Sequence, residues 1–210
     1  MADILSRRLF TAMAAGAVFG SGSELSADEK PKAELPKAGV GPVEAPFERD
    51  YAPPEFKPSW KKPQTNRLLV QDFVIFAHMD LPMVKKLLDR EPSLVLATMN
   101  WSAGDWESGL GAASHMGRRD IVEVLLERGA RIDIFCAAML GMTDVVKAFL
   151  TMQPKLIDAK GPHGFSLHFH AQVGGKESEK TLDYLQTVKK IELKPNPFLK
   201  KDDAPAKKPA

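Results

Sequence analysis

The sequence predicts an all-α fold made of stacked pairs of helices, and three observations support this prediction. One amphipathic helical pattern recurs four times, in residues 80–92, 119–130, 143–154 and 179–190. A shorter segment of small or apolar residues precedes each copy, and a glycine follows most of these segments. A single helix pair cannot bury its apolar face alone, so recurring pairs are expected to stack on their neighbours as a repeat array.

The recurring helices share one apolar face. Val84, Val122, Val146 and Leu182 occupy equivalent positions, and further apolar residues follow three and four positions later. Residues at this spacing lie on the same side of a helix, so the stripe is expected to be buried. Leu125 belongs to the stripe and is predicted to lie in the core.

The segments that precede these helices are the predicted first helices of each pair: FVIFAHM, LGAASHM, FCAAML and HFHAQV. Gly117, Gly141 and Gly175 come after three of them. Each is expected to form the turn between the helices with a positive φ, which glycine adopts without a steric penalty.

The combined pattern L-x-x-A-[AS]-x-x-G-x-x-D-[IV]-V-x-x-L-L-x-x-G-A resembles the ankyrin repeat. The match is best in residues 108–130, good in 135–153, and degenerate in 73–92 and 164–186. The resemblance implies an ankyrin-repeat solenoid of about four helix-pair repeats with degenerate terminal repeats. It also implies a non-catalytic module that binds another, unidentified protein through its concave groove and inter-repeat loops.

The copies are unevenly spaced, which departs from the family pattern. Val84 and Val122 are 38 residues apart, Val122 and Val146 are 24 apart, and Val146 and Leu182 are 36 apart. The 24-residue step leaves no room for the projecting β-turn that the resemblance implies between copies. The 38-residue step has extra room, occupied by ATMNWSAGDWESG.

Composition divides the chain into four parts. Residues 1–27 have a charged start and a short apolar run, and Ser6-Arg7-Arg8-Leu9-Phe10 resembles the core of a twin-arginine signal, which predicts export to the periplasm or another extracytoplasmic space. Residues 28–66 are rich in proline and lysine and are predicted to be a linker. Residues 67–194 form the predicted ankyrin-repeat domain, and residues 195–210 the predicted disordered tail.

Charge and cysteine content exclude several classes. The 29 basic and 27 acidic residues give a net charge of +2 without a basic cluster, so no nucleic-acid partner is expected. The apolar run near the N-terminus is too short to span a bilayer, so no membrane span is expected. The single Cys136 excludes an intramolecular disulfide and is predicted to be buried. The oligomeric state stays open.

The long inter-repeat segment contributes three candidate partner-binding residues. Trp101 and Trp106 are of a residue type that anchors interfaces, although they could instead pack over their own repeat, with Trp106 the more buried of the two. Asp105 lies between them and is expected to cap the next helix.

Three more candidates come from the predicted first helix LGAASHM and the turn that follows it. His115 is expected to face a ligand or to bond a loop carbonyl. Arg118 and Arg119 are candidate clamps for a partner's carboxylate, or else pair with Asp120 and Glu123 at the solvated edge.

The sequence gives little indication of catalysis or of cofactor binding. No Ser-His-Asp arrangement, phosphate-binding loop or Cys-His pair stands out, so no catalytic residue and no cofactor is predicted. The alternative to protein binding is an envelope protein that binds a small molecule or a metal with the His163–His170 segment. No metal ligands are assigned, because His168 and His170 would point to different faces of a helix.

Overall fold

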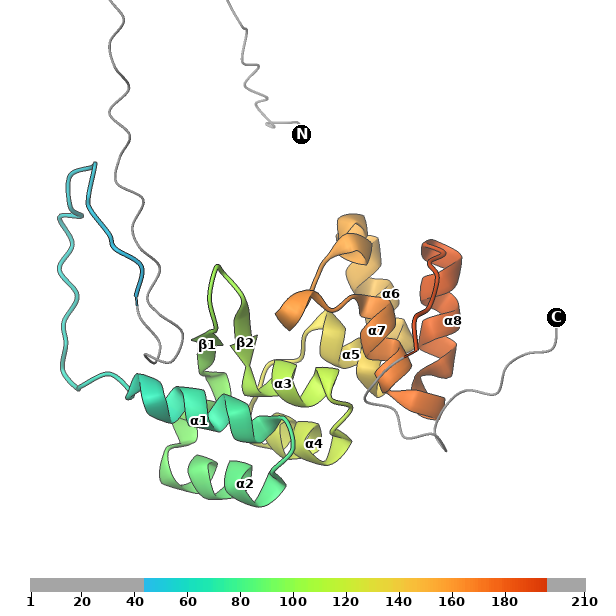
Figure 1. Ribbon diagram of the computed structural model, residues 1–210, viewed down its shortest axis with the longest axis horizontal. Coiled ribbons are helices and arrows are strands. Elements are labelled where there is room, and N and C mark those ends of the chain that lie inside the picture. Colours follow the sequence, from blue (N-terminus) through green and yellow to red (C-terminus); the bar gives the residue numbers. More distant parts are fainter. Residues whose placement is uncertain (1–43, 196–210) are drawn as a thin grey trace, which may run out of the picture. The chain divides into compact units, whose positions relative to one another are not determined.

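The structure is a computed structural model that describes residues 44–195 (Figure 1). It falls into two units, and residues up to Pro53 belong to the first. The second unit, from Pro54 onward, contains all the helices and strands described below. The predicted signal peptide, residues 1–27, lies outside the described residues, as does the predicted tail apart from Pro195.

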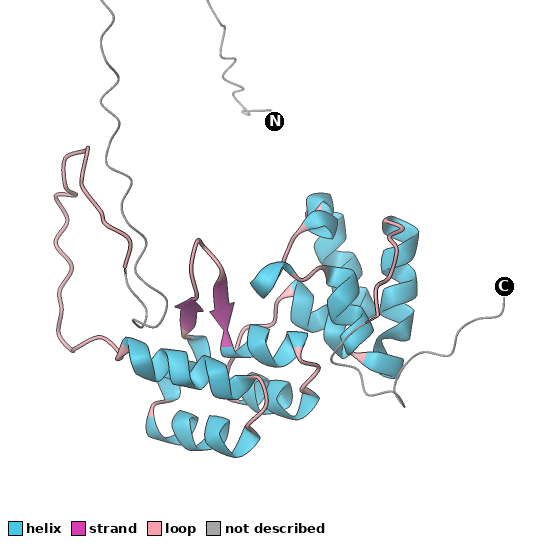
Figure 2. Ribbon diagram, in the orientation of Figure 1, coloured by secondary structure: helices cyan, strands magenta, loops and turns pink. Residues whose placement is uncertain are grey.

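The described residues are mostly helical, as the all-α prediction requires, with one small sheet (Figure 2). Eight α-helices follow in four pairs: α1 (Arg67–Ala77) and α2 (Leu81–Arg90), α3 (Gly109–His115) and α4 (Arg119–Glu127), α5 (Ile134–Leu140) and α6 (Thr143–Met152), and α7 (Leu167–Val173) and α8 (Glu179–Val188). Each predicted second helix is found within its expected range.

The helices form two layers. The first helices pack side by side in the order α1, α3, α5 and α7, and α2 packs against α4 and α6 against α8 in the other layer (Figure 1). This arrangement follows from the apolar stripe, because each second helix turns that stripe toward the first-helix layer. Val84, Val122, Leu125 and Val146 are fully buried, which confirms the predicted core face.

Two core clusters divide the packed interior. The larger is centred on α1 to α4 and includes Phe73, Leu94 and Leu125, and the smaller joins α5 to α8 around Leu167 and Leu185. Cys136 is fully buried in the larger cluster, as predicted, and burial raises the pKa of its thiol to about 12.

The connections between pairs differ in length and carry the irregular structure. Between α2 and α3 come a 3₁₀ turn, η1 (Pro92–Leu96), and an antiparallel hairpin of β1 (Thr98–Asn100) and β2 (Trp106–Ser108). Residues 128–133 alone join α4 to α5, and this short link has no strand or 3₁₀ turn, as the 24-residue spacing predicts.

The remaining 3₁₀ turns lie in the connection from α6 to α7 and in the turn within the last pair. Between α6 and α7 lie η2 (Pro154–Asp158) and η3 (Pro162–Gly164), and η4 (Gly175–Ser178) precedes α8. A bridge between Lys160 and Ser166 closes the loop around η3 into a finger.

The predicted glycine turns are found. Gly117, Gly141 and Gly175 have φ values of 68°, 77° and 67°. None of the helices among residues 44–195 combines the length and the apolar character needed to cross a membrane.

Candidate metal centre

Three histidines and a glutamate converge between the ends of two first helices, the β1–β2 hairpin and the η3 finger. His78 is the C-cap of α1, Glu107 lies on β2, His115 ends α3, and His163 lies in η3. One ligand atom from each residue can be chosen so that all four atoms lie within 4.8 Å of one another. Imidazole nitrogen and carboxylate oxygen are among the usual ligands of zinc and its first-row neighbours.

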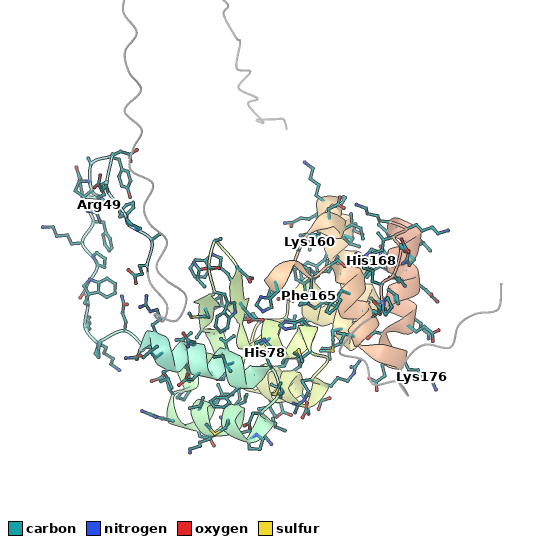
Figure 3. All side chains as sticks on the ribbon, in the orientation of Figure 1. Arg49, His78, Lys160, Phe165, His168 and Lys176 are labelled. Atoms are coloured by element: carbon teal, nitrogen blue, oxygen red, sulfur yellow. The ribbon has the colours of Figure 1, made fainter. Side chains whose placement is uncertain are left out.

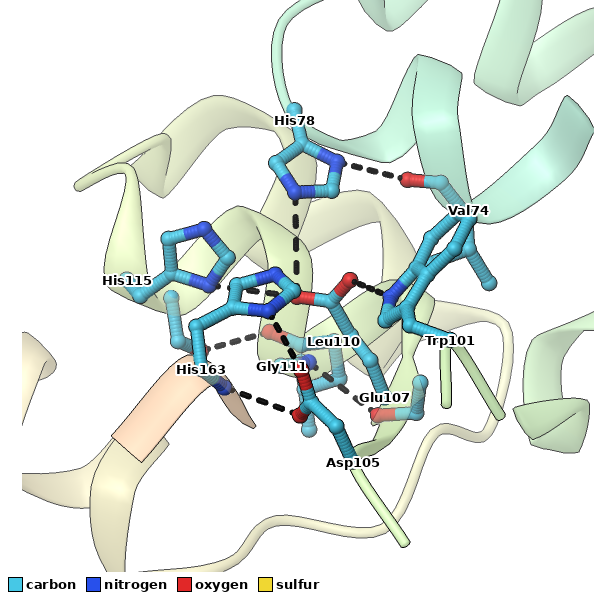
Figure 4. A network of polar contacts seen from close by, with 11 residues as sticks. Val74, His78, Trp101, Asp105, Glu107, Leu110, Gly111, His115 and His163 are labelled. Atoms are coloured by element: carbon cyan, nitrogen blue, oxygen red, sulfur yellow. Dashed lines mark hydrogen bonds and ion pairs between the residues drawn. The ribbon is translucent and has the colours of Figure 1, made fainter. Parts of the chain in front are cut away.

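The carboxylate of Glu107 is the centre of the group (Figure 4). Its Oε1 lies 3.2 Å from His115 Nδ1, 3.4 Å from His163 Nε2 and 3.7 Å from His78 Nε2. Two atoms that each bind one ion at about 2.1 Å with a tetrahedral angle between them are about 3.4 Å apart. The separations around Oε1 therefore match those of ligands in a single coordination sphere.

Two of the imidazoles are held with a lone pair facing the group. His78 Nδ1 lies 2.8 Å from the carbonyl oxygen of Val74, and His163 Nδ1 lies 2.7 Å from Asp105 Oδ2. Carbonyl and carboxylate oxygens only accept hydrogen bonds, so in each ring Nδ1 carries the hydrogen. In the neutral ring Nε2 is then the atom with a free lone pair, and it is Nε2 that faces Glu107.

A hydrogen bond also orients the carboxylate of Glu107. Its Oε2 accepts a 2.6 Å hydrogen bond from Trp101 Nε1, which leaves Oε1 directed at the histidines. Burial raises the pKa of Glu107, but the imidazoles of His115 and His78 and the Trp101 indole outweigh burial and hold it below its usual value. The carboxylate is therefore ionised, as a ligand must be.

Asp105 fixes the finger that carries His163. Its Oδ1 accepts a 2.9 Å hydrogen bond from the backbone N–H of His163, in addition to the side-chain contact at Oδ2. The backbone bond from His163 is the main reason that the pKa of Asp105 is lowered. His163 has φ of 56°, a conformation that costs energy for a residue with a Cβ.

The finger also rests on α3 at Gly111. A Cβ on Gly111 would lie 3.1 Å from Pro162 Cγ, so a residue without a side chain permits this close approach. The strained conformation of His163 is thus held by contacts on both sides.

The two tryptophans are placed opposite to the prediction. Trp101 is the more buried and contacts Glu107, whereas Trp106 is 60% exposed. Strand β2 explains the exchange, because successive side chains point to opposite faces and Glu107 takes the inward position.

Asp105 does not cap the next helix, contrary to the prediction. Ser108 is the N-cap of α3, and its side chain accepts a hydrogen bond from Gly111 N at 3.1 Å. Asp105 lies too early in the chain to reach those amides, because β2 comes between.

The predicted arginine clamps are engaged within the protein. Arg118 pairs with Asp120 at 2.6 Å, as expected, and also donates to the carbonyl oxygen of Met79. Arg119 pairs with Glu177 rather than with the expected Glu123, and donates to Met139 O. It therefore joins α4 to α5 and η4.

The His163–His170 segment does not act as one site. Only His163 joins the group, because His168 Nε2 lies 2.9 Å from Lys189 O and His170 Nδ1 lies 2.8 Å from Ser166 O. His168 lies with the last helix pair, away from His78 (Figure 3). Burial lowers the pKa of both His168 and His170, which keeps their rings neutral.

The sequence analysis missed Glu107 as a site residue and did not connect His78 with His115. A signal was present: His78 and His115 occupy equivalent positions in the predicted first helices FVIFAHM and LGAASHM. Adjacent repeats place equivalent positions side by side, so the two rings were predictable neighbours. Their centroids are 5.0 Å apart.

A comparison with protein-family profiles and with curated protein sequences finds no match.

Proposed function

We propose that the protein binds a divalent first-row transition-metal ion through His78, Glu107, His115 and His163. The observation that carries this proposal is the convergence of the histidine nitrogens on Glu107 Oε1 at 3.2–3.7 Å. One cationic partner would be enough to neutralise Glu107, whereas three imidazoles and one carboxylate gathered together supply a complete set of four metal ligands.

The outer contacts give this proposal independent support. Metal-binding histidines regularly donate their second N–H to a carbonyl or a carboxylate, and these partners fix the ring and raise its basicity. Val74 O and Asp105 occupy those two roles for His78 and His163. The rings of these two histidines are therefore oriented without an ion.

The ligand set favours borderline ions over hard or soft ones. Three nitrogens and one oxygen suit Zn²⁺, Co²⁺, Ni²⁺ or Cu²⁺, whereas Ca²⁺ and Mg²⁺ prefer oxygen alone. The proposed role is binding, with no catalytic residue assigned.

Metal content and cobalt titration test the proposal directly. The purified full chain should contain about one equivalent of a transition metal, and the chelator-treated chain should bind Co²⁺ with a visible absorption band typical of nitrogen and oxygen ligands. Glu107→Gln keeps an oxygen that accepts the Trp101 bond but removes the charged ligand, so its affinity should fall at least about tenfold.

His168→Gln is the matched control, because it removes a buried histidine outside the group. This variant should bind Co²⁺ as the parent does. If the parent binds no Co²⁺ after chelation, or if both variants lose affinity equally, the assignment of the ligands is wrong.

A second function is favoured by one observation, the exposed Trp106 on the hairpin. We propose that the helix pairs belong to an exported ankyrin-type solenoid and that the β1–β2 hairpin contacts another protein, since exposed tryptophan is enriched at binding hot spots. Affinity capture from the envelope fraction with the parent and Trp106→Ala tests this role. Recovery of the same proteins by both baits would remove Trp106 from the interface.

A further inference from the structure

An apolar pocket lies beside the candidate metal centre. It has a volume of about 550 Å³ and is lined by Ile75, Phe76, His78, Met79, Asp80, Trp101, Met116 and His163. The volume falls within the range of small-molecule sites, about 300–1,000 Å³. Two of the lining residues are proposed metal ligands, and Trp101 orients a third.

The burial of the ligands shows which side of the ion would be open. The side chains of Glu107 and His115 are 0% and 3% exposed, whereas those of His78 and His163 are 21% and 34% exposed. The exposed pair lines the pocket. The open side of the coordination sphere therefore faces the pocket, and Co²⁺, Ni²⁺ and Cu²⁺ can accept a further ligand there.

The remaining wall of the pocket is mostly apolar. Ile75, Phe76, Met79, Trp101 and Met116 supply aliphatic, aromatic and thioether surfaces. Asp80 is the one carboxylate among the lining residues, and its Oδ1 accepts a 3.0 Å bond from Met83 N as the N-cap of α2. The pocket thus offers apolar contact along its wall and a metal at one side.

We propose that this pocket binds a small aromatic molecule that donates one nitrogen or oxygen atom to the metal. The inference rests on the proposed metal function, because the donor atom needs an ion to bind. Apolar contact and coordination would act together, so an aromatic donor should bind more tightly than the same donor without its ring.

Two probes that differ by one ring test the inference. The Co²⁺-loaded full chain is titrated with imidazole and with 4-phenylimidazole, and the change in the cobalt absorption band is followed. Both should shift the band, and 4-phenylimidazole should bind at least about tenfold more tightly because its phenyl group is buried against the pocket wall.

A pair of variants tests whether the phenyl group binds against the pocket wall. The double variant Ile75→Ser with Met79→Ser removes apolar wall at two exposed positions, so the fold should be kept and the advantage of the phenyl ring should shrink severalfold. Leu68→Ser changes an exposed apolar residue of α1, the helix that carries Ile75, outside the pocket. It should leave the advantage of the phenyl ring unchanged.

The outcomes separate the two proposals. If Co²⁺ binds but 4-phenylimidazole has no advantage over imidazole, or if the band does not move, the pocket inference is overturned while the metal function stands. If the wall variant keeps the full advantage, the ring lies elsewhere and the inference is again overturned. If Co²⁺ itself does not bind, the metal function fails and the inference with it.

Discussion

Trp101 orients Glu107 without being a ligand, so its substitution separates orientation from coordination. Trp101→Phe keeps the aromatic body but removes the indole N–H that bonds Glu107 Oε2. The freed carboxylate can rotate, and we expect Co²⁺ affinity to fall about 10- to 100-fold, the usual effect of losing an outer-shell partner. Trp106→Phe, an exposed change in the same hairpin, should leave affinity unchanged. Equal affinities for both variants would contradict the role of Trp101.

His170 makes the stability of the protein depend on pH. Burial lowers the pKa of His170 from 6.5 to about 4 in the folded protein. As pH falls through 6.5 the unfolded chain takes up a proton that the folded chain does not, so the free energy of unfolding decreases toward pH 4. The total loss is about 3 kcal/mol by pH 4. We expect denaturant unfolding of the chelator-treated parent to show this fall.

His170→Leu should reduce this acid sensitivity. The Ser166 carbonyl oxygen also accepts the backbone N–H of residue 170, so the change leaves that oxygen bonded. The free energy of unfolding of the variant should change less between pH 7 and pH 4.5 than that of the parent. Parallel pH curves for the two proteins would show that His170 is not the group responsible.

At the scale of elements, the turn between α5 and α6 depends on Gly141. A Cβ at this position would lie 2.2 Å from the carbonyl oxygen of Glu177, and φ is 77°. At Gly129 φ is also positive, at 97°, but no atom lies within 4 Å of the added Cβ. Gly129→Ala should therefore cost about 1–2 kcal/mol from backbone strain, and Gly141→Ala at least about 1 kcal/mol more from the clash with η4.

Urea unfolding of both variants at one pH measures the difference. If the two glycine variants lose the same stability, the packing of η4 against the α5–α6 turn is looser than described. A shared change in the slope with denaturant would point instead to the unfolded state.

The helices were predictable because their signal is local, whereas the site was not. The apolar stripe through Val84, Val122 and Val146 depends only on spacing within each helix, and each helix is found where that spacing places it. Asp105 and His163 are 58 positions apart and meet because the link between α4 and α5 is short. With no finger at residues 128–133, the η3 finger packs against α3 and reaches the β1–β2 hairpin.

The irregular spacing therefore has a structural consequence that spacing alone does not reveal. The 24-residue step predicts a link without a projecting β-turn, which the structure confirms. Beside that short link, α7 and η3 contact α3 of the second helix pair. Glu107 was missed for a related reason: its inward position depends on the strand pairing of Met99 with Glu107, and a short hairpin within a helical repeat has a weak sequence pattern.

At the scale of the whole helical unit, the four proposed ligands come from three separate segments between His78 and His163, so a bound ion would join the first two helix pairs to the η3 finger. Binding to the folded state alone stabilises it by mass action, by about 2.7 kcal/mol when free metal is at 100 times the dissociation constant. We expect saturating Zn²⁺ to raise the melting temperature of the chelator-treated full chain by several degrees and to slow proteolysis in residues 154–166, since the finger is then tied to α1 and β2. Glu107→Gln should show little of either effect, whereas His168→Gln should show both in full. A rise in melting temperature of the same size in Glu107→Gln would place the ion elsewhere in the chain.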